Sequence, residues 1–145
     1  MSLQTVRFLT PSKFSEKFIR EGTLAKDEKV KCFYKGIRDM LIITDKRMIT
    51  IDKKGFTGKK QKYLSVPLDK IVSYSITTAG GIDLDSDLEI FLSGLGSVKA
   101  GILRPNITHE SKKLSHLLNL PKLIPIIEPK TIAIKNADKA LVNVI

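Results

Sequence analysis

Short runs of alternating apolar and polar residues fill much of the first hundred positions, and turn residues separate them. In residues 30–35, for example, every second side chain is Val, Cys or Tyr, and two of the three others are Lys. That period is typical of a β-strand with one buried face. Two apolar runs flank Asp45 and Lys46, a combination that favours a hairpin turn. We therefore predict seven strands, within residues 30–35, 40–43, 48–51, 64–68, 71–78, 88–92 and 98–102.

Helical spacing appears before and after this strand-rich region. Thr10 suits an N-cap and Gly22 suits the residue after a helix, with apolar residues of one helical face between them. Residues 107–120 place leucines on one stripe and end before Pro121. Such a stripe must be buried, and the open end of a bent sheet offers the surface for it. The pattern therefore predicts an N-terminal helix and a C-terminal capping helix.

The length of 145 residues is that of one domain with a single hydrophobic core. The fold class that we expect is mainly β with helices, a seven-stranded bent antiparallel barrel or sandwich. The domain should occupy residues 1–120, including the N-terminal helix. Residues 121–145 are too apolar for a free linker. We expect this extension to pack on the domain, to add a strand to its sheet or to contact a neighbouring subunit.

Five short patterns, in this order and spacing, resemble the bacterial pleckstrin-homology-like family. They are Gly36–Asp39, Thr44–Arg47, Gly55–Lys60, Val66–Pro67 and Ala79–Leu88. The resemblance covers about residues 5–120. It implies seven antiparallel strands in two near-orthogonal sheets with a capping C-terminal helix, and assembly into homo-oligomeric rings. The biochemical role that it implies is largely undefined.

Positive charge is concentrated in the first half of the chain. The formal net charge is +10, and residues 1–62 hold 16 Lys and Arg against seven Asp and Glu. A Gly-containing turn between strands can direct ammonium and backbone N–H groups toward one phosphate cluster. The candidate anion-binding residues are therefore the lysines of this connection, namely Lys53, Lys54, Lys59, Lys60 and Lys62.

Two partners would suit this basic loop. Anionic membrane lipid is the first, because each lysine near the surface contributes about 1 kcal/mol before screening. Nucleic acid is the least favoured, because no recognition-helix, zinc or RNA-binding motif accompanies the charge. A solvated basic surface without a specific partner remains the plain alternative.

An acidic stripe offers a third kind of partner, a second copy of the chain. Asp83, Asp85, Asp87 and Glu89 share one parity of a strand, and apolar residues share the other. A basic loop and an acidic stripe in different places allow copies to pair head to tail, and such a contact closes into a ring if the rotation permits. An ordinary hairpin with a polar face is the alternative. The candidate assembly residues are Arg38, Phe56, Asp83, Asp85, Asp87 and Glu89.

We expect no catalytic residues and no bound cofactor. Cys32, His109 and His116 belong to no nucleophile or metal-ligand pattern, and Cys32 should be an inert core thiol. Our preferred function is a non-catalytic binding and assembly module, which forms a homo-oligomer and presents a basic surface.

We also expect no metal site and no membrane span. The Asp83–Asp87 repeat imitates the start of a calcium loop, but Leu88 and Gly94 stand where that loop needs Gly and Glu. No apolar stretch approaches the roughly 20 residues of a membrane-spanning helix. The N-terminus lacks the pattern of an export signal. The expected location is the cytoplasm, with the inner membrane surface as the place of action if lipid is the partner.

Overall fold

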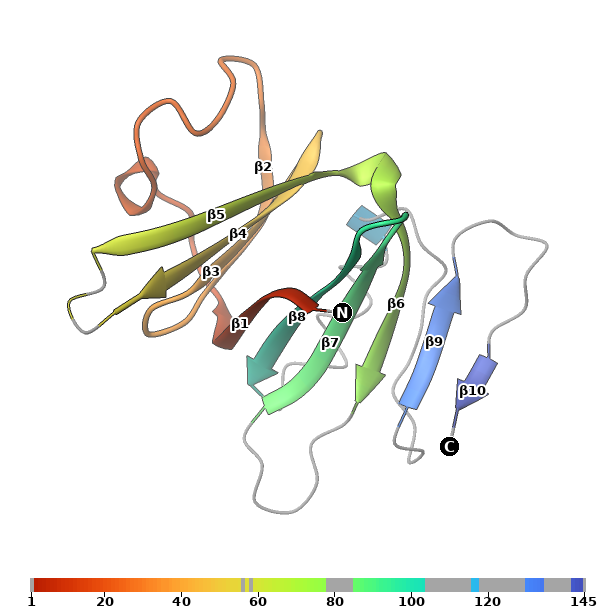
Figure 1. The fold of residues 1–145 in the computed structure, drawn as a ribbon. Coiled ribbons are helices and arrows are strands. Elements are labelled where there is room, and N and C mark those ends of the chain that lie inside the picture. The colour runs from red at the N-terminus through yellow and green to blue at the C-terminus, as the bar shows by residue number, and fades with distance from the viewer. Residues whose placement is uncertain are drawn as a thin grey trace.

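The described part of the chain forms one bent sheet of ten strands in the computed structural model (Figure 1). The structure describes residues 2–55, 57, 59–77, 85–103, 116–117, 130–134 and 142–144. The strand order across the sheet is β10-β9-β6-β7-β8-β1-β2-β3-β4-β5. The strands are β1 (Ser2–Pro11), β2 (Val30–Lys35), β3 (Met40–Thr44), β4 (Arg47–Lys54), β5 (Lys60–Pro67), β6 (Ile71–Thr77), β7 (Asp85–Leu92), β8 (Gly96–Leu103), β9 (Lys130–Ile134) and β10 (Val142–Val144).

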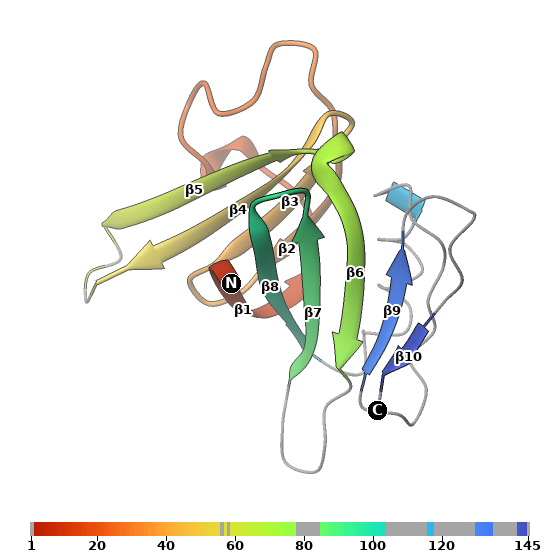
Figure 2. The same ribbon diagram turned by 45° about the vertical axis from the view of Figure 1, so that its right-hand side comes forward.

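The sheet bends into two halves whose strands cross one another (Figures 1 and 2). β2 to β5 form one antiparallel meander and β6 to β8 form another. The 3-10 turn η2 (Leu68–Lys70) connects the halves between β5 and β6. The predicted hairpin around Asp45 is confirmed, because β3 pairs with β4 from Met40↔Ile51 to Ile43↔Met48. Each of the seven predicted segments falls on one of the strands β2 to β8.

β1 is a strand that the sequence pattern did not predict, and it makes the sheet mixed. Its first part pairs parallel with β8, from Ser2↔Ser97 to Leu9↔Ile102. Its end pairs antiparallel with β2, where Pro11 lies opposite Tyr34. β1 thus belongs to both halves of the bent sheet. The prediction of a purely antiparallel, seven-stranded fold is therefore wrong.

The main hydrophobic core is built from one face of the sheet. In a strand, alternate side chains point to opposite faces, so the apolar parity of each strand in the two halves faces the same interior. Cys32 belongs to this core and is buried, as predicted. The other fully buried members include Val6, Leu9, Tyr34, Leu41, Ile43, Met48, Ile71, Tyr74, Ile76, Leu88, Ile90, Val98 and Ile102.

A second, smaller core lies on the opposite face of β2 to β4, and it replaces the predicted N-terminal helix. Its buried residues are Phe33, Met40, Ile42, Ile49 and Ile51. The segment 12–29 runs over this face (Figure 1) and supplies partly buried cover from Phe14, Ile19 and Leu24.

The predicted helix at residues 10–22 is wrong because β1 continues through Pro11 and keeps Thr10 paired with Lys35. Phe14 and Phe18 do not form a helical stripe. Both rings pack on Phe33, at centroid distances of 5.4 and 5.6 Å. Only the 3-10 turn η1 (Glu16–Phe18) forms between them. An isolated helix of about 12 residues, such as the predicted one, gains too few hydrogen bonds to offset the cost of its nucleation. Tertiary packing of the two aromatic rings therefore decides the conformation of this segment.

The predicted C-terminal capping helix is not found in the described residues either. Only His116 and Leu117 are helical there, and the rest of 107–120 lies outside the described residues. Leu117 is partly buried against the main core. Within the described ranges, no helix has the length and apolarity needed to cross a membrane.

Two strands from the extension 121–145 add to the sheet. β9 pairs antiparallel with β6, from Ser73↔Ile134 to Ile76↔Thr131, and β10 pairs with β9. In Figures 1 and 2, β9 lies beside β6 and β10 lies beyond β9. Contact of this extension with a neighbouring subunit stays a prediction.

Candidate functional site

The five candidate lysines lie around the β4–β5 hairpin, but on two different faces of it. Residues directly opposite in an antiparallel pair point to the same side. Lys54 is opposite Lys60 and Asp52 is opposite Lys62, so three of the lysines share the face of the main core. Lys53 is opposite Gln61 and shares the other face. The structure therefore does not gather the five ammonium groups into one cluster.

Two of these lysines are engaged within the chain. The Lys54 ammonium lies 3.0 Å from the Asp52 carboxylate, and the Lys62 ammonium donates to the Leu3 carbonyl oxygen at 2.8 Å. The side chains of Lys59 and Lys60 are exposed and have no ion pair in the described part of the chain. The tip of the hairpin therefore presents two ammonium groups to solvent.

The Gly36–Asp39 turn between β2 and β3 packs against β1 and against the start of the lysine connection. The Gly36 N–H donates to the Asp39 carbonyl oxygen at 2.8 Å. Gly36 has no room for a side chain, because a Cβ atom there would collide with the Arg7 carbonyl oxygen. The Arg38 guanidinium donates to the carbonyl oxygen of Gly55. Phe56, the next candidate assembly residue, lies outside the described residues.

The Asp39 side chain ties three segments together. Its carboxylate accepts the backbone N–H of Arg7 at 3.1 Å and that of Lys53 at 3.3 Å. These bonds connect β1 and the end of β4 to the turn. Burial raises the pKa of Asp39, and the neighbouring Asp52 carboxylate acts in the same direction.

An exposed apolar patch surrounds this turn. Ile37 is 86% exposed and Phe8 is 45% exposed. Phe8 has φ of 58°, a conformation that a residue with a Cβ atom rarely adopts, and the β1–β8 register shifts between Val6 and Leu9. A cavity of about 270 Å³ lies here. The residues that line it are Arg7, Phe8, Ile37, Arg38, Asp39, Asp52 and Lys53, and we call them the Phe8–Ile37 patch.

The acidic stripe is only partly described. Asp83 lies outside the described residues, and for Asp85 the structure describes the backbone alone, as the first residue of β7. Asp87 is exposed. Glu89 accepts the Ser97 hydroxyl at 2.6 Å and lies opposite Lys99 on β8. These two carboxylates therefore lie on the half of the sheet that does not contain the lysines.

The Thr44–Arg47 pattern holds segment 12–29 in place. The Arg47 guanidinium donates to both carboxylate oxygens of Glu28, at 2.8 Å each, and also bonds the carbonyl oxygen of Thr23. The Glu28 side chain is 1% exposed. The Arg47 hydrogen bonds lower the pKa of Glu28 to about 2. This pair is a structural clamp, and its charges neutralise each other.

His116 is exposed and His109 lies outside the described ranges. Among the residues that the structure describes, no three His, Cys, Asp or Glu side chains are grouped to hold a metal ion. The sequence pattern alone did not indicate Arg7, Phe8 and Ile37 as residues of a candidate surface. Ile37 could have indicated this surface, because it is an apolar residue between Gly36 and Arg38 in a predicted turn.

A bent sheet whose halves cross, as observed here, defines the pleckstrin-homology-like class of domains. A crystal structure of a DUF1696 family protein with a pleckstrin-homology domain from Shewanella loihica PV-4 is similar, with a TM-score of 0.63 and 28% identity. The alignment covers 77% of this chain and 98% of that one. The pleckstrin homology domain from Shewanella amazonensis SB2B gives a TM-score of 0.57 and 34% identity, over 66% of this chain and 78% of that one.

The family description "Bacterial PH domain" matches residues 2–124, and the chain belongs to this family. It is also 38% identical over 101 residues to the uncharacterized protein YjqA of Bacillus subtilis (strain 168), which covers 70% of this chain and 75% of that protein. These names indicate no enzymatic family. The resemblance inferred from the five short patterns is confirmed.

Proposed function

We propose that this bacterial PH domain is a non-catalytic module that binds copies of itself and presents a basic surface to a partner. The Phe8–Ile37 patch is the observation that supports the proposal most directly. An isoleucine that is 86% exposed beside an exposed phenylalanine gains little in a monomer. Buried in an interface, the same side chains would remove apolar surface from water.

The patch is held in a fixed shape, which favours its use as an interface. The Asp39 bonds fix the backbone at Arg7 and Lys53, on both sides of the exposed apolar side chains. A surface that is already ordered loses little conformational entropy on binding. The left-handed conformation of Phe8 costs folding energy, and such strain is concentrated at functional sites.

Charge favours a second copy as the occupant of the patch. Asp39 and Asp52 also line the patch, but they are partly buried, whereas the cations of Arg7 and Arg38 are exposed, on the β2–β5 side of the sheet. Asp87 and Glu89 lie on β7, in the other half. Two different surfaces of opposite charge allow a heterologous contact between copies, in which attraction selects the neighbour and the register.

The test compares two substitutions of exposed apolar turn residues. Ile37→Asp places a charge in the patch, whereas Leu95→Asp places one in the β7–β8 turn, where Leu95 is 59% exposed. We expect Ile37→Asp to weaken self-association at least about tenfold, because it buries a carboxylate in an apolar contact. Leu95→Asp should leave it unchanged. Sedimentation equilibrium over a range of concentrations measures both constants.

Two outcomes would contradict the proposal. One is equal association of the two variants, which would place the contact elsewhere. The other is loss of association in both, which would indicate a general effect of added negative charge. A circular dichroism spectrum of each variant checks that the fold is retained.

Binding of anionic lipid is the second candidate function. The exposed ammonium groups of Lys59 and Lys60 at the hairpin tip favour it. The internal bonds of Lys54 and Lys62 reduce the number of lysines that could face a membrane at the same time. For this reason self-association is our first proposal.

A further inference from the structure

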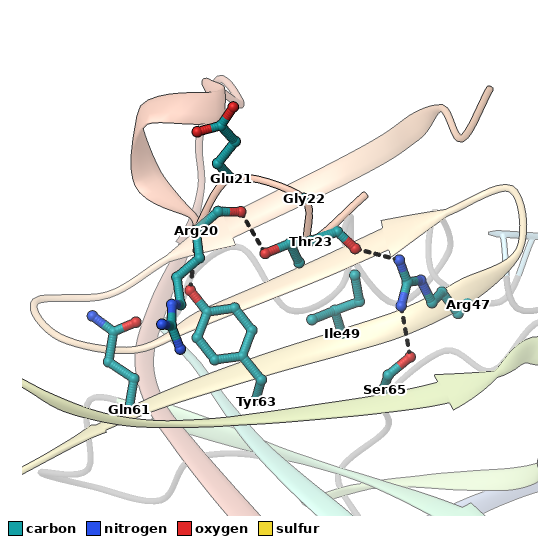
Figure 3. A pocket seen from close by; sticks show the side chains of 9 residues that line it. All are labelled: Arg20, Glu21, Gly22, Thr23, Arg47, Ile49, Gln61, Tyr63 and Ser65. Carbon is teal, nitrogen blue, oxygen red and sulfur yellow. Dashed lines mark hydrogen bonds between the residues drawn. The ribbon is translucent and has the colours of Figure 1, made fainter. Parts of the chain in front are cut away.

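A cavity of about 470 Å³ opens between the turn at 20–23 and the outer face of the β4–β5 hairpin (Figure 3). Ile49 and Tyr63 give it an apolar wall. Gln61 and Ser65 stand two positions before and after Tyr63 on β5, so they project from the same face and add polar groups. A cavity of this size, with an apolar wall and a few polar groups, suits a small molecule.

The cavity continues toward the tip of the hairpin. A neighbouring cavity of about 280 Å³ is lined by Arg20, Gln61 and Lys59, and the first cavity shares two of these residues. We call the two together the Arg20–Tyr63 pocket. It lies on the opposite side of the sheet from the main core, because residues 20–23 of segment 12–29 line it together with Ile49 and Tyr63 of the second core.

The walls of the pocket are fixed by hydrogen bonds. The Tyr63 hydroxyl accepts the backbone N–H of Arg20 at 3.2 Å. The Arg20 carbonyl oxygen accepts both the backbone N–H of Thr23, at 3.1 Å, and its hydroxyl, at 2.6 Å. Gly22, with φ of +84°, allows the chain to turn between them. A ligand would therefore meet a mouth that is already formed, as Figure 3 shows.

The pocket has two cations that the described residues do not neutralise. Glu28 neutralises Arg47 at the rear. The Arg20 guanidinium and the Lys59 ammonium have no ion pair in the described part of the chain. Glu21 also borders the pocket, but Figure 3 shows its carboxylate directed away from Tyr63. The accessible charge at the mouth is therefore positive.

We propose that the Arg20–Tyr63 pocket binds a phosphate monoester. A guanidinium matches two phosphate oxygens with two parallel N–H donors, and an ammonium adds a compact charge beside it. Arg20 and Lys59 would hold the phosphate, and Tyr63 and Ile49 would contact the body of the ligand. Gln61 supplies a donor and an acceptor for hydroxyl groups. The proposal goes beyond self-association and does not depend on it.

The experiment is calorimetric titration of the full chain with inorganic phosphate and with glycerol 3-phosphate. We expect glycerol 3-phosphate to bind more tightly, because only it has a body to contact the apolar wall. Arg20→Gln should weaken binding at least about tenfold, since it removes charge-assisted hydrogen bonds. Lys59→Gln should weaken it less. Lys99→Gln, an exposed lysine on the other half of the sheet, should bind as the wild type does.

Binding to lipid vesicles distinguishes the two sources of a phosphate monoester, a lipid headgroup and a free ligand. Phosphatidic acid in phosphatidylcholine vesicles presents the same monoester at a membrane surface. Binding to these vesicles that is lost in Arg20→Gln assigns the pocket to a lipid headgroup. Binding to soluble glycerol 3-phosphate alone assigns it to a free ligand. Equal binding by Arg20→Gln and Lys99→Gln overturns the proposal. So does the absence of binding to any probe at about 10 mM, a concentration about tenfold above a weak Kd of about 1 mM.

These results are separable from those on self-association. Sedimentation equilibrium of Arg20→Gln should match the wild type, because Arg20 does not line the Phe8–Ile37 patch. Ile37→Asp should bind glycerol 3-phosphate normally, because Ile37 does not line the pocket. The failure of one proposal would therefore leave the other standing.

Discussion

The carboxylate of Glu28 is almost completely buried, and it contacts more than its partner Arg47. It accepts the Thr44 hydroxyl at 2.6 Å and the Ala25 backbone N–H at 3.1 Å. All these bonds favour the ionised form. Their sum explains why the pKa lies near 2 although burial alone would raise it.

Acid should therefore weaken the fold through Glu28. Its folded pKa of about 2 lies below the ordinary value of 4.5. The stabilisation is complete above pH 4.5, and it is lost as the pH falls toward 2. At about 1.4 kcal/mol for each unit of pKa, ionisation of Glu28 favours the folded state by at most about 3 kcal/mol.

Glu28→Gln tests this directly. We expect a loss on the order of 3 kcal/mol in the free energy of unfolding at pH 7, because Arg47 would keep only neutral partners. The difference from the wild type should shrink as the pH falls from 4.5 toward 2. Urea denaturation at pH 7 and pH 3, at one protein concentration, measures both effects. A constant difference at all pH values would contradict the assignment.

Asp27→Asn is the matched control for this substitution. Asp27 is adjacent in the sequence and forms an ion pair of 2.9 Å with Lys46, but both side chains are exposed. Solvent screens such a pair. Asp27→Asn should therefore leave the urea midpoint nearly unchanged.

Asp39 acts in the opposite sense. Burial raises its folded pKa above the ordinary value of 3.8, so its contribution is complete below pH 3.8 and is lost as the pH rises through the folded pKa. Mild acidification therefore protonates the Asp39 carboxylate, which removes the cost of burying its charge, while it begins to weaken the Glu28 clamp. The net acid loss should become clear only at lower pH, where Asp39 is already protonated.

Among the strands, β1 joins the two halves of the sheet, because it lies between β8 of one half and β2 of the other. Gln4 is buried under β4 and β5. Its side-chain amide donates to the Lys62 carbonyl oxygen at 2.8 Å, and its side-chain oxygen accepts the Thr50 hydroxyl. β1 is thereby fixed to the hairpin that carries the lysines.

Gln4→Ala should destabilise the protein by about 1–3 kcal/mol, because it leaves the buried Thr50 hydroxyl without its acceptor and removes the hydrogen bond to the Lys62 carbonyl oxygen. Thr5→Ala, the adjacent substitution on the opposite face of β1, should change stability by less than about 0.5 kcal/mol. Urea unfolding of both variants provides the comparison. Equal effects would show that β1 does not depend on this polar contact.

Most of β2 to β8 could be predicted from the sequence because their apolar residues alternate at the period of a strand. β3 is instead a continuous apolar run, and the turn residues between β3 and β4 predicted the hairpin. β1 could not be predicted, because its buried residues Val6 and Leu9 are three positions apart. The bulge at Phe8 changes the parity there. The aromatic spacing after Pro11 suggested a helix, although the rings pack on Phe33 instead.

The candidate site was predictable in part. The identities of the lysines and the turn Gly36–Asp39 are evident from the chain. The lysines lie on two different faces of the hairpin because of the β4–β5 register, and the sequence did not define that register. Arg20 and Tyr63 lie 43 positions apart, so only the fold brings them together.

At the scale of the whole molecule, the two surfaces that we propose are separate. The Phe8–Ile37 patch lies where β1, the β2–β3 turn and the end of β4 meet, and the Arg20–Tyr63 pocket lies between residues 20–23 and the β4–β5 hairpin. The net charge of +10 disfavours close approach of copies at low salt. Attraction between the exposed arginines of the Phe8–Ile37 patch and the β7 carboxylates must therefore act locally, at distances shorter than the screening length of about 10 Å at 0.1 M salt.

We propose above all that this domain associates with itself through a preformed patch. The most direct test is sedimentation equilibrium of the wild-type chain from nanomolar to about 100 µM, a range that covers the affinities of specific protein contacts. We predict a mass that rises above 16.2 kDa to a defined multiple, and Ile37→Asp should shift that rise to higher concentration. A wild-type mass that stays at 16.2 kDa throughout would show that the domain does not associate with itself.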